Sequence, residues 1–208
     1  MKAEVDICCT SANAVQVVEQ VAREWGVNRV VLLPDEFLAR NVARQTEIGI
    51  IAWQGRCEVH ERFTVEDIDE IRAAWPGAKI LAHPECPPEV LEAADFAGST
   101  AAMTDYVMMR KPRQVVLITE CSMADNVACD APDTEFVRPC NLCPHMKRIS
   151  LEAIHDALKF ERFEIKIDPL IAARARAAVQ RMIDLPPPTV PARYDLVKAR
   201  HHVDVELI

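Results

Sequence analysis

The sequence lacks an apolar run of the roughly 20 residues that a membrane-spanning helix needs, so we expect no membrane association. The first residues, MKAEVDICC, also lack the basic start, apolar core and small cleavage site of a secretory signal. An excess of positive charge is missing as well, since the net charge is −8, which argues against a broad nucleic-acid surface. These absences predict a cytoplasmic protein without a nucleic-acid partner, in a compartment where thiols stay reduced.

The composition is that of a globular protein. Of the 208 residues, 50% are apolar and 27% are charged, and this length suits one large domain or two small ones. The chain carries eight cysteines. In a reducing compartment, so many cysteines favour metal binding or thiol chemistry over a disulfide framework.

Short apolar runs alternate with amphipathic ones along the chain. The predicted strands are residues 4–11, 28–34, 49–55, 78–84, 113–120 and 134–139, with 95–100 as a short strand or loop. The predicted helices are residues 13–25, 35–46, 64–77, 87–94, 99–110 and 150–162, and a last one between Pro169 and the prolines at 186–188. This alternation predicts βαβ units, and therefore an α/β fold of repeated αβα layers with short parallel sheets and C-terminal helices.

The pattern restarts after residue 88. We therefore expect one α/β unit over residues 1–88, a second and smaller unit over 89–148, and C-terminal helices with a tail over 149–208. The last twenty residues mix polar and apolar side chains, and we expect them to be loosely held.

Polar and thiol side chains follow nearly every predicted strand. The segments are Cys9–Ser11, Pro34–Asp35, Trp53–Cys57, His83–Cys86, Gly98–Thr100, Thr119–Cys121 and Arg138–Cys140. In open α/β sheets, ligands bind beyond the carboxyl ends of the strands. A strand that only packed in a core would have no reason to end in this way each time, so these ends predict the functional site.

The stretch RPCNLCPHMKRIS contains a Cys-x-x-Cys pair, Cys140 and Cys143, followed directly by Pro144. This spacing suits zinc, a redox disulfide or an iron–sulfur cluster. A second such pair, which would favour structural zinc, is missing from the sequence. A cysteine followed by proline is a local pattern of bacterial ferredoxin ligands, but the proline could also open the helix of a thioredoxin-type site. The residues alone leave the three alternatives open.

The other cysteines differ in their surroundings. Cys57 follows Gly55 just past a predicted strand, which makes it a further candidate ligand. Cys86 is ambiguous. A structural role is favoured for the remaining cysteines that have no partner at metal spacing, which are Cys8, Cys121 and Cys129.

The tripeptide His83-Pro84-Glu85 places an imidazole and a carboxylate at one corner of the chain. Together they could bind a carboxylate or move a proton, although an ordinary solvated turn explains such a tripeptide taken alone. His60 lies three residues after Cys57 and could bind a metal, but a histidine in this setting more often packs or faces water.

Small hydroxylated residues precede two predicted helices, with Ser11 before the first and Ser99 and Thr100 before another. Helix N-termini offer free N–H groups and a positive dipole end, which suit phosphate or carboxylate. Helix capping is the commoner explanation for any single case. Two such sites at matching positions of two α/β units favour a binding role.

Five segments, CTSANAV, WQGRCEVHERFT, HPEC, GST and CPHMKRISLEAI, resemble the quinolinate synthase family in their order and spacing. The resemblance runs from residue 1 to about residue 185. It implies three similar αβα domains around a pseudo-threefold axis, with a [4Fe–4S] cluster at the centre. It also implies a transferase of NAD biosynthesis that condenses iminoaspartate with dihydroxyacetone phosphate to quinolinate, releasing phosphate and water. The implied protein partner is L-aspartate oxidase, as the source of iminoaspartate.

The resemblance assigns two cluster ligands to this chain. Cys57 matches one by its segment, and Cys143 matches another because the family places a ligand three residues before a Met-Lys pair, here Met146-Lys147. The family holds its cluster by three cysteines, one in each domain. One iron is therefore left open, and such an iron acts as a Lewis acid toward the substrate.

The resemblance also assigns substrate-contacting residues. Glu85 matches the acid/base of the isomerisation and dehydration steps, and His83 matches a residue that anchors a carboxylate. Ser11, Ser99 and Thr100 match positions that bind phosphate or carboxylate oxygens.

The family's first domain would precede Met1. It carries the third cysteine ligand, together with a tyrosine, a histidine and a Tyr-x-Asn segment of the active site. We therefore expect this chain alone to bind the cluster poorly and to turn over little. The alternative hypothesis is a non-catalytic module that binds a dicarboxylate or a structural zinc ion, the zinc ligands being Cys57, Cys140, Cys143 and either Cys86 or a histidine.

Overall fold

The computed structural model describes residues 1–139, 141–186, 193–194 and 205–208. The chain divides into two compact units. Unit 1 comprises Met1–Cys9 and Leu142–Pro187, and unit 2 comprises Thr10–Asn141 and Pro188–Ile208. Within these described residues, no helix combines the length and the apolar character that crossing a membrane requires.

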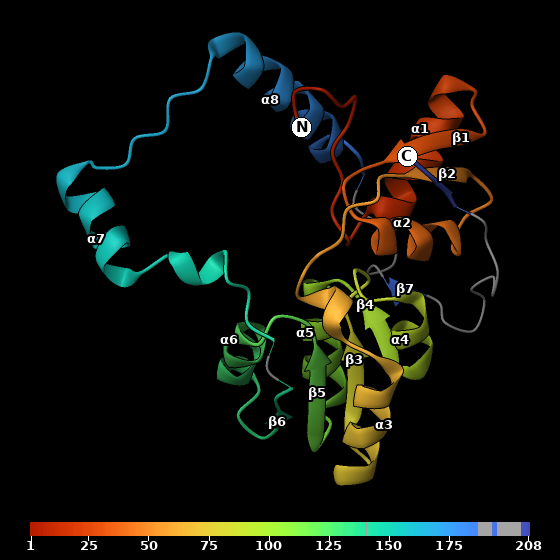
Figure 1. Ribbon diagram of the computed structural model, residues 1–208, viewed down its shortest axis with the longest axis vertical. Coiled ribbons are helices and arrows are strands. Elements are labelled where there is room, and N and C mark those ends of the chain that lie inside the picture. Colours follow the sequence, from red (N-terminus) through yellow and green to blue (C-terminus); the bar gives the residue numbers. More distant parts are fainter. Residues whose placement is uncertain (140, 187–192, 195–204) are drawn as a thin grey trace. The chain divides into compact units, whose positions relative to one another are not determined.

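Unit 2 contains a small parallel sheet with the strand order β1-β2-β8 (Figure 1). Its strands are β1 Arg29–Leu32, β2 Gly49–Ala52 and β8 Glu206–Leu207, and the helices beside it are α1 Ala14–Trp25 and α2 Glu36–Ala43. Helix α2 forms the crossover that two parallel neighbours require. Helix α1 ends at Gly26, whose left-handed backbone (φ 65°) a glycine adopts without steric cost.

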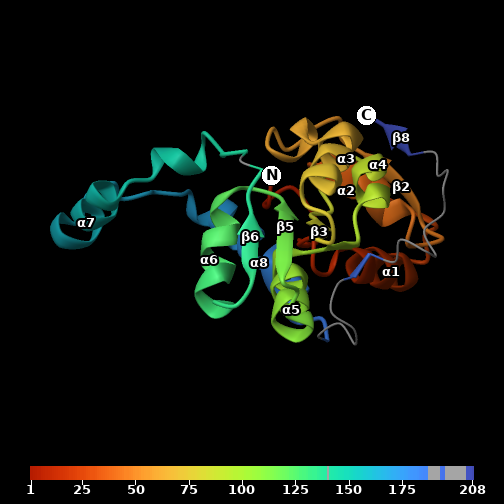
Figure 2. The ribbon, with the colours of Figure 1, turned by 90° about the horizontal axis from the view of Figure 1, so that it is seen from below.

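The second sheet of unit 2 has five strands in the order β6-β5-β3-β4-β7, and only β7 is antiparallel to its neighbour. The strands are β3 Lys79–Ala82, β4 Phe96–Gly98, β5 Gln114–Ile118, β6 Glu135–Val137 and β7 Arg193–Tyr194. The helices are α3 Val65–Ala74, α4 Pro88–Ala93, α5 Thr100–Arg110 and α6 Ser122–Asp130. Helices α5 and α6 cover one face of the sheet and α3 lies on the other (Figures 1 and 2).

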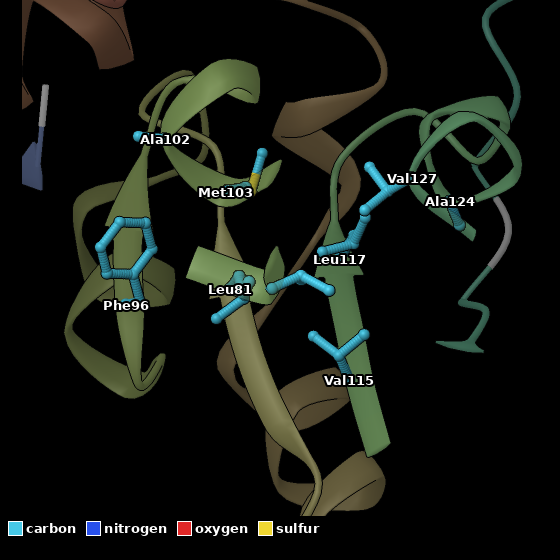
Figure 3. Close-up of a cluster of buried hydrophobic side chains, with 9 residues drawn as sticks. Leu81, Phe96, Ala102, Met103, Val115, Leu117, Ala124 and Val127 are labelled. Carbon is cyan, nitrogen blue, oxygen red and sulfur yellow. The ribbon is translucent and has the colours of Figure 1, made fainter. Parts of the chain in front are cut away.

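Strand β5 is buried on both of its faces. Val115 and Leu117 lie on the face covered by α5 and α6, where they belong to one apolar cluster with Met103 (Figure 3). The alternate residues Val116 and Ile118 are 0% exposed and point to the opposite face. A strand covered on both faces has to be apolar throughout, which explains its unbroken apolar run VVLI.

Unit 1 is helical, with the short 3₁₀ helix η2 Met146–Arg148 followed by α7 Leu151–Phe160 and α8 Pro169–Ile183. The side chain of Ser150 caps α7, and that of Asp168 caps α8, each by accepting backbone N–H bonds. The first residues of the chain lie against α8, since the Cys8 N–H donates to the Ala178 carbonyl at 3.1 Å.

The predicted α/β fold with short parallel sheets is confirmed, and β1 to β6 all fall within predicted runs. The strand predicted at residues 4–11 is wrong. Apolar character alone does not show whether a neighbouring strand exists. Here the backbone of Cys8 pairs with helix α8 instead.

Strand pairing also differs from the predicted grouping in two places. The predicted unit over residues 1–88 places β3 with the strands before it, whereas in the structure β3 pairs with β4 and β5. Helix α4 (Pro88–Ala93) is the crossover that connects the parallel neighbours β3 and β4. Part of the tail, predicted to be loosely held, joins both sheets as β7 and β8. Residues 187–192 and 195–204 lie outside the described residues. The domain boundaries at residues 88 and 148 remain predictions.

Candidate metal centre and active site

Three side chains with metal-binding atoms converge in unit 2, namely Cys57, His60 and Glu85. Their ligand atoms all lie within 4.8 Å of one another. Cys57 follows β2, His60 begins the 3₁₀ helix η1 (His60–Arg62), and Glu85 follows β3, so the group joins segments from both sheets. This agrees with the expectation that side chains beyond the carboxyl ends of the strands meet in space.

His60 is the buried centre of this group. The residue is 7% exposed, its Nε2 lies 2.9 Å from Oγ1 of Thr119, and its Nδ1 lies 3.1 Å from Oε2 of Glu85. Its ring stacks on the ring of His83, with centroids 4.6 Å apart and an interplanar angle of 21°. Of the alternatives left open for His60, exposure to water is therefore wrong, and a role beside the thiol of Cys57 gains support.

Asp35 fixes the loop that carries Cys57. Its Oδ1 accepts the Leu38 N–H at 2.6 Å and so caps α2, while its Oδ2 accepts the Cys57 N–H at 2.9 Å. Gly55 permits the tight path of the same loop, because a Cβ at this position would lie 2.5 Å from the Pro34 carbonyl oxygen. Cys57 is therefore oriented through its backbone, and its sulfur takes no part in this fixation.

Mutual contacts set the charges of the group. Burial alone would raise the pKa of Cys57, but the neighbouring His60 outweighs it and lowers the pKa. Burial alone would lower the pKa of His60, but the neighbouring Cys57 and Glu85 raise it to about 9. Burial alone would raise the pKa of Glu85, but contacts with His60 and His83 lower it. These contacts favour the thiolate form of Cys57, and at neutral pH His60 is an imidazolium and Glu85 is a carboxylate.

His83 has the opposite protonation state. Burial, and then the charge of His60, lower the pKa of His83 to about 4, so its ring is neutral at pH 7. The Glu85 backbone N–H donates to Nδ1 at 3.3 Å, which assigns the ring proton to Nε2. That Nε2–H donates to Oγ of Ser11 at 3.2 Å. The structure thus brings three predicted site residues, Ser11, His83 and Glu85, to one place.

Asn41 supports the turn that carries His83 and Glu85. It is 2% exposed, and its Nδ2 donates to the carbonyls of Pro84 at 2.8 Å and Cys86 at 3.0 Å. The sequence alone does not indicate this role of Asn41, because an asparagine inside a predicted helix carries no signal that it bridges to a distant turn.

Ser99 and Thr100 follow β4 at the start of α5. Oγ of Ser99 accepts the Ala102 N–H at 3.2 Å, and Thr100 is the exposed first residue of the helix. Among the contacts of the described residues, none joins Ser99 or Thr100 to His83 or Glu85. Helix capping accounts for Ser99, and the substrate-binding role of both residues remains a prediction.

Cys143, the second predicted ligand, lies in unit 1 in the same local setting that Cys57 has in unit 2. The carbonyl of each cysteine accepts the N–H of the residue four positions later, at 3.1 Å for Cys143 and 3.0 Å for Cys57. A 3₁₀ helix begins three residues after each cysteine. A hydroxylated N-cap, Thr64 or Ser150, then opens an α-helix. The segments CEVHERFT and CPHMKRIS therefore form a local structural repeat.

The other cysteines differ from this pair. Cys86 is fully buried, its Sγ donates to the Ile118 carbonyl at 3.6 Å, and burial raises the pKa of its thiol well above the usual value. Cys129 is exposed on α6, where its Sγ donates to the Asp125 carbonyl at 3.3 Å. Cys140 lies outside the described residues. The zinc and redox alternatives that use Cys140 remain predictions.

Comparison with known proteins gives the family. The sequence profile of the quinolinate synthetase A protein family matches residues 1–184. The chain belongs to the quinolinate synthetase A family. It is 72% identical over 208 residues to the quinolinate synthase of Caulobacter vibrioides and 60% identical over 185 residues to that of Agrobacterium fabrum. It is 62% identical over 183 residues to quinolinate synthase 1 of Mesorhizobium japonicum. The predicted resemblance is confirmed.

The three quinolinate synthases are longer than this chain. The matches cover 100%, 89% and 88% of this chain, but 57%, 52% and 55% of the Caulobacter, Agrobacterium and Mesorhizobium proteins respectively. The chain thus spans little more than half the length of the curated relatives that it matches.

Proposed function

We propose that this chain carries part of the active site of a quinolinate synthase, which condenses iminoaspartate with dihydroxyacetone phosphate to quinolinate, releasing phosphate and water. The observation that carries the proposal is the convergence of the Cys57 thiolate with the His83 and Glu85 pair. A thiol suited to hold a metal centre lies there beside groups suited to move protons. We further propose that an L-aspartate oxidase supplies the iminoaspartate, and that a domain not matched by this chain completes the site.

The thiols fit an iron–sulfur cluster. Cys57 and Cys143 occupy equivalent turns, and both side chains are partly exposed, so each thiol can be reached by a cluster. The thiolate, which the surroundings of Cys57 favour, is the form that binds iron. A [4Fe–4S] cluster with one iron not bound by the protein supplies a Lewis acid that holds substrate oxygens. The third thiolate is assigned by the family resemblance to the family's first domain.

Glu85 is suited to take up and return a proton. Its carboxylate is anionic, and its side chain is 29% exposed, so a substrate can reach it. The imidazolium of His60 lies 3.1 Å from Oε2 and stabilises that anion. A proton taken from a substrate carbon by Glu85 can therefore be transferred to a leaving hydroxyl of the same substrate.

His83 and Ser11 are suited to hold a substrate oxygen. The neutral His83 ring donates from Nε2 toward Oγ of Ser11. A substrate carboxylate that replaces this contact receives one N–H from the imidazole and one O–H from the serine. Ser99 and Thr100 are proposed to bind a further phosphate or carboxylate at the start of α5.

The test uses the chain fused behind the part of the Caulobacter vibrioides quinolinate synthase that it does not match. The fusion and the chain alone are reconstituted anaerobically with iron and sulfide, and cluster content and quinolinate formation are measured. We expect a cluster and turnover in the fusion, and little of either in the chain alone.

Single variants of the fusion assign the residues. We expect Cys57→Ser and Cys143→Ser to lose the cluster, while Cys129→Ser, an exposed thiol on α6, keeps cluster and turnover. Glu85→Gln should keep the cluster and lower turnover by roughly 10²- to 10⁴-fold. A fusion that retains its cluster without Cys57, or full turnover without Glu85, would overturn the proposal.

A further inference from the structure

The Nδ1 atom of His60 is a buried nitrogen that faces the carboxylate of Glu85 and the thiol of Cys57. It approaches Oε2 of Glu85 to 3.1 Å, but the contact is not aligned as a hydrogen bond, and Nδ1 has no hydrogen bond among the described residues. The thiol of Cys57 completes the group within 4.8 Å. A buried polar atom in this state usually marks a site for a water or an ion.

The donor set fits a single transition-metal ion. In tetrahedral zinc sites the ligand atoms lie about 2.0–2.3 Å from the ion, and therefore about 3.5 Å from one another. The three donor atoms here lie within 4.8 Å, so small side-chain movements bring them to that spacing. One thiolate, one neutral imidazole and one carboxylate suit Zn²⁺, whereas Ca²⁺ and Mg²⁺ require oxygen ligands. Binding of the ion therefore releases to solvent the Nδ1 proton of His60 and any proton on the Cys57 sulfur.

The surroundings orient these donors as in known metal sites. A metal-binding histidine usually engages its second ring nitrogen with a neighbouring group, and Nε2 of His60 lies 2.9 Å from Oγ1 of Thr119. The Cys57 backbone is held by Asp35 at 2.9 Å. Cys57 and Glu85 are partly exposed, so solvent and an ion can reach the group from that side.

We propose that Cys57, His60 and Glu85 form a site for one Zn²⁺ ion in the cluster-free protein, with a water as a further ligand. The site goes beyond the proposed synthase function, because it needs only unit 2 and does not use Cys143. The equivalent turn in unit 1 has Met146 at the position of His60. Zinc and the iron–sulfur cluster exclude each other, since both need the Cys57 thiolate.

Cobalt is the probe for the zinc site, because Co²⁺ prefers similar ligands and absorbs visible light. The 208-residue chain, freed of metal by a chelator under reducing conditions, is titrated with Co²⁺ and then with Zn²⁺. We expect one Co²⁺ per chain, a thiolate-to-cobalt charge-transfer band, and loss of that band when Zn²⁺ displaces the cobalt.

Variants separate this site from other thiols. Cys57→Ser should remove the charge-transfer band, and His60→Gln and Glu85→Gln should each weaken cobalt binding at least tenfold. Thr119→Val, which removes only the contact to Nε2, should weaken it by about 10- to 100-fold. Cys143→Ser and Cys129→Ser should leave the affinity unchanged. Circular dichroism of each variant checks that it folds. If either His60→Gln or Glu85→Gln fails to fold, the other variant still tests the site.

Two results would overturn the zinc site: no cobalt bound to the folded chain, or a charge-transfer band that survives in Cys57→Ser. The outcome is distinguishable from that of the synthase proposal, because the cluster requires Cys143 and the zinc site does not. Failure of either proposal leaves the other standing.

Discussion

Asp35 and Cys57 are joined by a hydrogen bond from the Cys57 N–H to Oδ2 of Asp35, at 2.9 Å. The other oxygen of Asp35 caps α2 through the Leu38 N–H. One carboxylate therefore fixes both the start of a helix and the position of a candidate ligand. A change at residue 35 should therefore alter both the free energy of unfolding and the reactivity of the Cys57 thiol.

Asp35→Ala should lower the free energy of unfolding by about 0.5–2 kcal/mol through loss of the helix cap, and should also alter the rate at which Cys57 is alkylated. The matched control is Thr64→Ala, because Thr64 caps α3 with a comparable hydrogen bond to Asp67. Denaturant unfolding gives the stability, and peptide mass spectrometry gives the rate at Cys57. Equal alkylation rates in the two variants would contradict the assigned role of Asp35.

Alkylation of Cys57 should have its midpoint at a pH below 9, the usual pKa of the thiol, because His60 stabilises the thiolate. In His60→Gln that support is lost, burial remains, and the midpoint should move to higher pH. The measurement is the pH dependence of iodoacetamide labelling in the metal-free chain. The same midpoint in both proteins would show that His60 does not set the thiolate state.

His83 should stay neutral far below its usual pKa of 6.5, down to about 4, because burial and the charge of His60 oppose its protonation. The unfolded chain takes up this proton near pH 6.5 and the folded chain does not. The contribution of His83 to stability is therefore lost as pH falls from 6.5 to 4. His83→Gln should reduce that loss in urea unfolding. Imidazole resonances of His83 that titrate near pH 6.5 would refute this prediction.

Two methionines of α5 provide a matched test of the core. Met103 is 0% exposed and belongs to the apolar cluster of Figure 3, whereas Met109 is 71% exposed. Met103→Ala should cost about 2–5 kcal/mol of unfolding free energy, because it leaves a cavity. Met109→Ala should change it by no more than about 0.5 kcal/mol. Similar costs for the two changes in denaturant unfolding would mean that α5 is not packed as described.

Much of the fold could be predicted because its signals are local. The apolar run of β5 marks a strand covered on both faces, and Thr64, Ser99 and Ser150 mark helix starts that the structure confirms. The strand expected at residues 4–11 had the right composition. Its absence depends on a missing neighbour, which sequence periodicity does not report.

Several residues of the candidate site could be predicted from the sequence, but the contacts that connect them could not. Strand ends indicated Cys57, His83 and Glu85, whereas the bridges made by Asp35 and Asn41 depend on how distant turns approach one another. The local repeat around Cys57 and Cys143 was not predicted either. The two eight-residue segments share only the cysteine, one arginine and a hydroxylated last residue, which is too little to indicate a common structure.

His60 lowers the pKa of Cys57 and lies only three residues farther along the same turn. The His60 ring is in turn held by Thr119, which follows β5 in the other sheet of unit 2, and these two sheets have no strand in common. The reactivity of the Cys57 sulfur toward oxidants and stray metal therefore depends on the packing of both sheets, because that packing keeps the imidazole beside it.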